Sequence, residues 1–216
     1  TYFEGIGFFN EKKYDLAANS FQKVITEGHD KKEVRLLLVS SFILAKKHAE
    51  ALEIMLELFE KKQLDISEYQ TLASLFMEKG DYQKAINIYN PFLFTFFDNT
   101  IALNNRGYCF LRIGQYEKAI QDLNSAIIHN PKHAYAHNNR GLAKVRLGQT
   151  EEGLADINKS KSLDDSNAYV DLHLGYYFQK TNEIEKAHKH FQKAKEMEID
   201  FHGIDYLIET TRENDF

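Results

Sequence analysis

Three histidines stand four residues apart in the middle of the chain, at His129, His133 and His137. Imidazoles at this spacing share one face of a helix and bind zinc in some proteins. Asn130 and Pro131 place His129 in a turn, however, and no nearby carboxylate or cysteine completes a ligand set. We therefore interpret the three residues as solvated histidines around a turn, and we expect neither a metal nor a cofactor.

Side-chain amides that could bind a ligand by hydrogen bonds occur in two pairs of asparagines, Asn104 with Asn105 and Asn138 with Asn139, which lie 34 residues apart. Asparagine is a poor helix former, so its paired recurrence in a helical segment calls for an explanation. Each amide offers a donor and an acceptor, which suits the backbone of an extended peptide. The alternative is that these amides only bond to the adjacent helix.

A row of basic residues accompanies the amides, because Arg112, Arg146 and Lys180 are also 34 residues apart. Basic groups, and arginine above all, match the geometry of carboxylates, so this row predicts an extended protein segment with acidic groups as the partner. We expect the whole stripe to be exposed in a concave groove. Its other members are Tyr108, Tyr135, Tyr169, His173 and Tyr176.

The elements that position these residues form a 34-residue repeat that runs through the chain without insertion or deletion. One small-residue position reads Gly5, Val39, Ala73, Gly107, Gly141 and Gly175, and an alanine position and two large-apolar positions keep the same register. Spacings of three and four within each repeat indicate two helices. Between them lie residues that tolerate a left-handed backbone, namely Gly80, Gly114, Gly148 and Asn182.

This pattern resembles the tetratricopeptide repeat family over residues 1–201, and it is clearest in Gly107, Phe110, Ala119, Leu123, Ala126 and Pro131. The resemblance implies an all-α, right-handed solenoid, or superhelix, of helix-turn-helix hairpins whose first helices line a peptide-binding concave groove. The repeats are expected at about 1–31, 32–65, 66–99, 100–133, 134–167 and 168–201. Residues 202–216 would form a capping helix and tail, with Ile204, Leu207 and Ile208 as its apolar stripe.

The groove stripe changes along the chain. In the third repeat it reads Gln70, Thr71, Ser74 and Glu78, and in the first two repeats it is largely apolar. The sequence thus predicts an apolar N-terminal surface and a polar, basic C-terminal one.

Composition limits the function. A net charge of −5 and a pI near 6.0 argue against a nucleic-acid partner. No apolar run approaches the ~20 residues that span a bilayer. A single cysteine, Cys109, forms no internal disulfide and is interpreted as an inert helix thiol. We expect further chain before Thr1 in the natural protein, so the compartment stays open, with the cytoplasm favoured.

These observations predict a non-catalytic module that binds a peptide or protein segment in its groove. The alternatives are a structural scaffold or oligomerisation domain, and a regulatory domain of a larger protein. Self-association would involve the phenylalanines that follow Pro91, namely Phe92, Phe94, Phe96 and Phe97.

Three local expectations follow from single residues. Pro91 is expected to kink its helix or end it early. Gly153 occupies an alanine position, so Gly153→Ala is expected to stabilise the fifth repeat. Lys144 is expected to keep its ammonium group in water.

Overall fold

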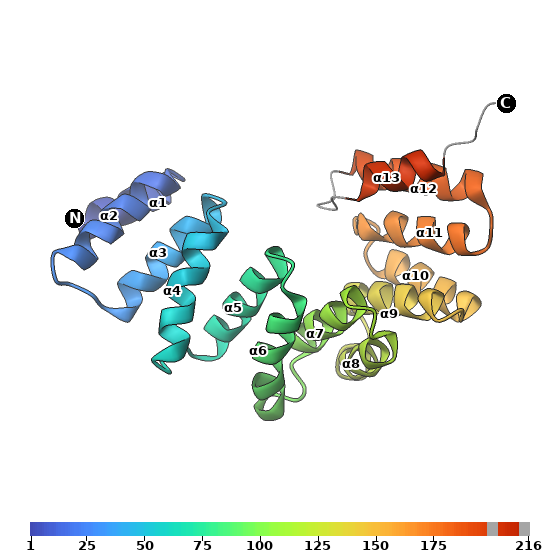
Figure 1. The fold of residues 1–216 in the computed structure, drawn as a ribbon, viewed down its shortest axis with the longest axis horizontal. Helices are drawn as coiled ribbons and strands as arrows, with labels where there is room; N and C mark the ends of the chain where they lie inside the picture. Colours follow the sequence, from blue (N-terminus) through green and yellow to red (C-terminus); the bar gives the residue numbers. More distant parts are fainter. Residues whose placement is uncertain (198–202, 212–216) are drawn as a thin grey trace. The chain divides into compact units, whose positions relative to one another are not determined.

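The computed structural model describes residues 1–197 and 203–211, and the regular secondary structure of these residues is entirely α-helical. Consecutive helices pair as antiparallel hairpins (Figure 1). The chain divides into two compact units, Thr1–Phe92 and Leu93–Phe216, called here the N-terminal and the C-terminal unit. The predicted all-α class of paired helices is confirmed.

The helices follow the 34-residue register. Those of the N-terminal unit are α1 (Tyr2–Asn10), α2 (Tyr14–Thr26), α3 (Lys32–Leu44), α4 (His48–Glu60) and α5 (Ile66–Glu78), and α6 (Tyr82–Thr95) passes into the next unit. Those of the C-terminal unit are α7 (Thr100–Arg112), α8 (Tyr116–His129), α9 (Ala134–Arg146), α10 (Thr150–Leu163), α11 (Tyr169–Lys180), α12 (Ile184–Glu196) and α13 (Ile204–Thr210). The odd-numbered helices from α1 to α11 are the first helices of the hairpins.

The turn inside each hairpin has a left-handed residue at one fixed repeat position. The φ angles there are positive in all six hairpins, at Lys12, Lys46, Gly80, Gly114, Gly148 and Asn182. Glycine and asparagine were expected at this position, because they adopt positive φ most easily. The two lysines were not expected, and they show that the register of the repeat outweighs the preference of a single residue.

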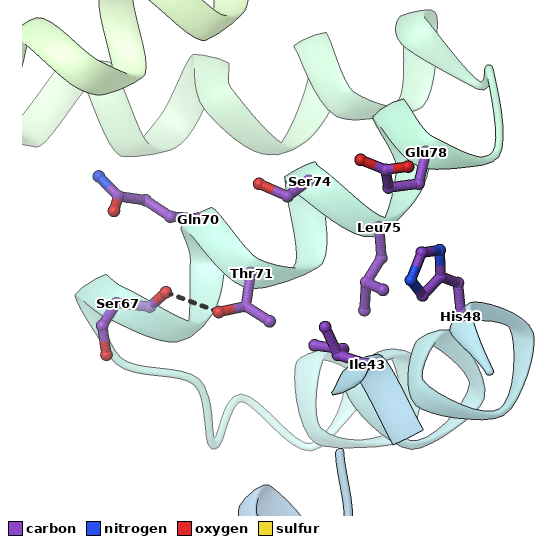
Figure 2. A pocket seen from close by; sticks show the side chains of 8 residues that line it. All are labelled: Ile43, His48, Ser67, Gln70, Thr71, Ser74, Leu75 and Glu78. Carbon is purple, nitrogen blue, oxygen red and sulfur yellow. Dashed lines mark hydrogen bonds between the residues drawn. The ribbon is translucent and has the colours of Figure 1, made fainter. Parts of the chain in front are cut away.

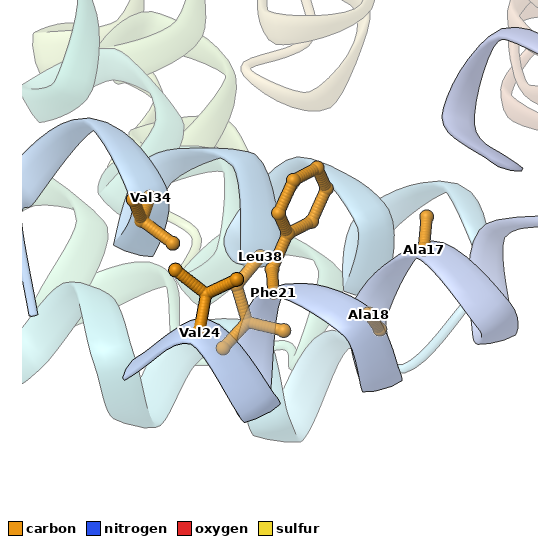
Figure 3. Close-up of a cluster of buried hydrophobic side chains, with 6 residues drawn as sticks. All are labelled: Ala17, Ala18, Phe21, Val24, Val34 and Leu38. Carbon is orange, nitrogen blue, oxygen red and sulfur yellow. The ribbon is translucent and has the colours of Figure 1, made fainter. Parts of the chain in front are cut away.

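The core of each hairpin lies between a small residue on the first helix and a large one on the second. In the N-terminal unit Phe21 is fully buried, and a Cβ atom placed on Gly5 would lie 2.7 Å from its ring. Figure 3 shows Phe21 of α2 within a cluster that includes Val34 and Leu38 of α3. The expected packing of small against large residues is therefore present in the first hairpin.

The fifth hairpin, α9–α10, brings two glycines together. A Cβ atom on Gly153 would lie 2.7 Å from the carbonyl oxygen of Gly141 and 2.7 Å from Cγ2 of Val145. The backbone of one helix thus occupies the space that an alanine methyl group would need. The expectation that Gly153→Ala stabilises this repeat is wrong, because the position demands glycine for close approach.

A buried carboxylate joins the same two helices. Asp156 accepts hydrogen bonds at 2.7 and 2.5 Å from Arg140 and at 2.7 Å from Lys144. Burial alone would raise the pKa of Asp156, but these hydrogen bonds outweigh burial and hold the pKa below its usual range. The expectation that Lys144 keeps its ammonium group in water is therefore wrong.

The C-terminal helix α13 covers the last hairpin, as predicted for a capping helix. Ile204 and Leu207 are buried and belong to one cluster with Phe191 of α12, and Ile208 packs against that cluster. The predicted end of the sixth repeat at 198–201, residue 202 and the tail at 212–216 lie outside the described residues.

Pro91 does not end its helix early. The helix α6 continues to Thr95, and it ends at the same repeat position as α8, which stops at His129. Proline removes one backbone donor, but Phe92 and Leu93 directly after it are buried, and their burial favours continuation. The expected early stop is therefore wrong.

Candidate functional site

The residues predicted to line the groove fall into two groups in the C-terminal unit. Arg112, Tyr135, Arg146 and Lys180 are exposed, and Asn105, Tyr108, Tyr169 and Tyr176 are partly exposed. The other four are buried, which contradicts the expected exposure of the whole stripe, and these are Asn104, Asn138, Asn139 and His173.

Of the three buried asparagine amides in the stripe, those of Asn104 and Asn139 bond to each other between repeats, while the side-chain amide of Asn138 has no hydrogen-bond partner among the described residues. The amide nitrogen of Asn139 in α9 donates to the side-chain oxygen of Asn104 in α7 at 3.0 Å, and Asn104 donates to Asn105 at 3.1 Å. Buried amides without partners are costly, so these contacts hold α7 against α9. For Asn104 and Asn139 the geometry agrees with bonding to the adjacent helix, the alternative that the sequence left open.

The next connection between repeats runs from α9 to α11. Nδ1 of His173 lies 3.2 Å from the backbone oxygen of Asn138, and because a carbonyl only accepts, this nitrogen must carry the proton. Burial lowers the pKa of His173 to about 4. His173 is therefore a neutral interior residue at physiological pH and does not present charge to a ligand.

The exposed part of the stripe pairs basic groups with tyrosines. Arg112 donates to the hydroxyl of Tyr108 at 2.5 Å, and the guanidinium of Arg146 lies 4.2 Å from the centre of the Tyr176 ring. Burial raises the pKa of Tyr176, while the charges of Arg146 and Arg112 oppose that rise. Both arginines thus act on Tyr176, and the three side chains form one basic and aromatic surface.

Arg146 differs from the arginines that serve the fold. Arg106 binds Asp122 through two hydrogen bonds of 2.7 Å, and Arg140 binds Asp156 in the same way. Arg146 is exposed and has no carboxylate partner among the described residues. Its charge remains available to a ligand.

The three histidines do not form a metal site. His129 is the last residue of α8 rather than a turn residue, and His133 caps α9 by accepting from the amide of Ala136. His137 is buried, donates through Nε2 to the oxygen of Pro131 at 3.0 Å and lies 3.7 Å from Asp156, so it is not solvated as expected.

Neither a metal site nor a reactive thiol is present in the described part of the chain. No group of three histidine, cysteine, aspartate or glutamate residues there could hold a metal ion. Cys109 is buried in α7, and burial raises its pKa to about 12, so its thiol stays protonated and weakly nucleophilic at neutral pH. No described helix is both long enough and apolar enough for a bilayer.

The first-helix face of the N-terminal unit carries a pocket. It is lined by Ile43, His48, Ser67, Gln70, Thr71, Ser74, Leu75 and Glu78, so all four stripe positions of the third repeat contribute to it (Figure 2). His48 was not anticipated from the sequence, because it begins α4, a second helix, and reaches the pocket from the neighbouring hairpin.

The phenylalanines after Pro91 differ in exposure. Phe92 is buried, Phe96 is partly buried, and Phe94 and Phe97 are 91% and 69% exposed. Phe97 makes an edge contact with the ring of His129. The expected self-association surface therefore cannot include Phe92 and is reduced mainly to Phe94 and Phe97.

Paired helices in a 34-residue register define a helical-repeat protein. Three models described as tetratricopeptide repeat match residues 8–76, 69–90 and 100–133. The chain belongs to the tetratricopeptide repeat family, whose members generally act as protein–protein interaction modules and are typically non-catalytic. The comparison with curated proteins gives no match.

Solved structures agree on the fold. MamA of Desulfovibrio magneticus is 25% identical over 78% of this chain and 96% of its own, with a TM-score of 0.63. A tetratricopeptide repeat protein of Parabacteroides merdae is 20% identical over 96% of both chains, with a TM-score of 0.65. In the Cut9–Hcn1 complex of the APC/C, the similarity covers 97% of this chain but 41% of the other, at 18% identity and a TM-score of 0.71.

Proposed function

We propose that the C-terminal unit is a non-catalytic binding module whose first helices, α7, α9 and α11, hold an extended protein segment that carries acidic side chains. The observation that carries this proposal is Arg146, which is exposed, oriented by Tyr176 and without a carboxylate partner among the described residues. A guanidinium held in this way is ready for a carboxylate from outside the chain.

The neighbouring positions extend the same surface. Lys180 stands 34 residues after Arg146, is exposed, and likewise has no acidic partner in the described ranges. Tyr135, which is exposed, and Tyr108 and Tyr169, which are partly exposed, supply aromatic surface on the same helices. Each exposed ion pair is worth about 1 kcal/mol or less, so recognition requires several of them together.

The test uses a short capped glycine–serine peptide with spaced glutamates, and calorimetry at low and high salt. We expect Arg146→Gln combined with Lys180→Gln to weaken binding about tenfold at low salt, and less at high salt, because screening already removes much of the attraction. Lys159→Gln combined with Lys161→Gln is the matched control, since both lysines are exposed on α10. Equal affinity of both double variants would contradict the proposal.

A second candidate function is self-association through Phe94 and Phe97. It is favoured by the exposure of two large aromatic side chains, since exposed apolar groups mark interaction surfaces when they gather. Sedimentation of the unchanged chain and of Phe94→Asp tests it. Dissociation of an oligomer by the substitution is the expected result, and a monomer in both cases contradicts this candidate.

A further inference from the structure

One position of the repeat changes the sign of its charge between the two units. The position that holds Arg112, Arg146 and Lys180 in the C-terminal unit holds Glu78 in the third repeat, after the uncharged Asn10 and Leu44 of the first two repeats. Each of these residues ends the first helix of its hairpin. A repeat position that is basic in the C-terminal unit is therefore acidic in the third repeat.

Glu78 lies at the negative end of its helix, next to the C-cap residue Lys79. It is the last residue of α5, where the helix dipole is negative, and the last turn of α5 contains no basic residue. Among the described residues Glu78 has no ion-pair partner, whereas Glu68 on the same helix binds Lys32 at 2.8 Å. A cation at this end of α5 would be stabilised both by the carboxylate and by the dipole.

The pocket beside Glu78 combines acceptors with apolar side chains. Figure 2 shows Ile43 and Leu75 facing each other across the pocket, with Glu78 and His48 at one end and the hydroxyl groups of Ser74 and Thr71 along α5. The Thr71 hydroxyl donates to the backbone carbonyl oxygen of Ser67 at 3.2 Å, which leaves the lone pairs of the hydroxyl able to accept. The pocket thus offers apolar surface for a hydrocarbon stem and oxygens for a donor.

We propose that this pocket binds a lysine side chain of a protein segment, a ligand different from the acidic one proposed for the C-terminal unit. The methylene stem packs on Ile43 and Leu75, and the ammonium group donates to the Glu78 carboxylate and to the hydroxyl of Ser74, one turn earlier on α5. An ammonium group has three donors on a compact head and suits separate acceptors, whereas the planar guanidinium of arginine favours two-point contact with one carboxylate.

The experiment uses three short capped glycine–serine peptides that differ in one central residue: lysine, acetyl-lysine or norleucine. Binding to the full chain is followed near neutral pH and low salt through the methyl NMR signals of Ile43 and Leu75. We expect saturable shifts with the lysine peptide and about fivefold weaker binding with norleucine, which keeps the stem but not the charge. Acetyl-lysine is expected to bind as weakly as norleucine. Equal binding of the three peptides would overturn the proposal.

Substitutions test the carboxylate itself. Glu78→Gln keeps the shape and removes the charge, and we expect it to weaken lysine-peptide binding about fivefold with an unchanged melting temperature, because Glu78 is exposed. Glu60→Gln is the control, since Glu60 is the exposed last residue of α4 and does not line the pocket. If both variants lose the same affinity, the lysine site is not at Glu78. Arg146→Gln is expected to leave lysine-peptide binding unchanged, so the proposed lysine site and the proposed site for acidic segments are tested independently.

Discussion

The two units share one repeat register but differ in what their interiors contain. In the N-terminal unit the buried polar side chains that the structure describes are Ser41 and Glu68. Ser41 bonds within α3, whereas Glu68 bonds to the start of its own helix and to Lys32 of α3. The C-terminal unit buries more polar side chains, and several of them, including Asn139, Asp156 and His173, have partners on neighbouring helices. The repeat thus specifies the backbone of both units. Apolar burial stabilises the N-terminal unit, and paired polar groups contribute much of the stability of the C-terminal unit.

The difference has an energetic consequence. Apolar burial is insensitive to pH and tolerates hydrophobic exchange, whereas a buried polar network is costly once one member is lost. Substitutions and acid are therefore expected to affect the C-terminal unit first. Amide hydrogen exchange can test this, because it reports the stability of each helix separately.

The largest effect is expected from Asp156→Asn. Arg140 and Lys144 would then lose the carboxylate that compensates their charges inside the α9–α10 hairpin. Breaking a buried ion pair costs about 3 kcal/mol or more. Exchange protection of α9 and α10 measures the loss, and Glu57→Gln in the N-terminal unit is the control. Glu57 binds Arg35 but is 48% exposed, so we expect Glu57→Gln to lower the free energy of unfolding by less than about 1 kcal/mol. If Glu57→Gln and Asp156→Asn lowered it equally, the two units would not differ in their dependence on buried charge.

Acid is expected to destabilise the C-terminal unit before the N-terminal one. The pKa of His173 is about 4 in the folded chain and near the usual histidine value of 6.5 when unfolded. Between these values the unfolded chain binds a proton that the folded chain does not, so the free energy of unfolding falls as the pH falls. Each pKa unit is worth about 1.4 kcal/mol, which gives a loss of roughly 3 kcal/mol by pH 4.

Exchange protection of α9 and α11 between pH 6.5 and pH 4, corrected for intrinsic rates, measures this loss. His173→Leu, which installs the residue found at Leu37 of the N-terminal unit, is expected to flatten the dependence. Asp156 and Asp171 have pKa values below the usual 3.8, because hydrogen bonds from basic partners outweigh burial. Their contribution is present above that value and is lost only at lower pH, so it does not overlap the window of His173.

A smaller loss, about 1–3 kcal/mol, is expected for Gly153→Ala, because its Cβ atom would force α9 and α10 apart. The control is Gly7→Ala in α1, where a Cβ atom would meet nothing within 4 Å. There alanine is expected to stabilise by about 0.5–1 kcal/mol, since glycine is a poor helix residue. Urea unfolding compares the two variants, and a stabilised Gly153→Ala would mean that the helices can separate without cost.

The packing at Gly153 could not be predicted from the sequence alone, although most of the fold could. The 34-residue register predicted the paired helices, the small-against-large packing and the left-handed turns at Gly114 and Asn182, because each depends on one recurring position. A glycine in an alanine position has two opposite meanings, a defect or a close approach, and only the distance to Gly141 distinguishes them.

The candidate site shows the same limit for polar residues. The exposure of Arg112, Arg146 and Lys180 followed from their periodicity, but the burial of Asn104 and Asn139 did not. An amide that faces a peptide and an amide that faces the next helix have the same sequence pattern. A difference of one residue around the helix, about 100°, decides between them.

The smallest effect is expected from the pair Asn104 and Asn139, whose counterparts in the second repeat are Leu36 and Leu37. Asn139→Leu alone leaves the side-chain oxygen of Asn104 buried without its 3.0 Å donor, which is expected to cost about 1 kcal/mol. Adding Asn104→Leu removes that orphaned acceptor, so the double variant is expected to regain most of the loss.

Urea unfolding of both single variants and the double variant completes a double-mutant cycle. Both amides are buried, so the glutamate peptide is expected to bind all three variants like the unchanged chain. If instead Asn139→Leu weakened peptide binding without a loss of stability, the amide would face the ligand after all. The C-terminal unit would then use its asparagines for recognition, and its contrast with the leucines of the N-terminal unit would be one of function rather than of packing.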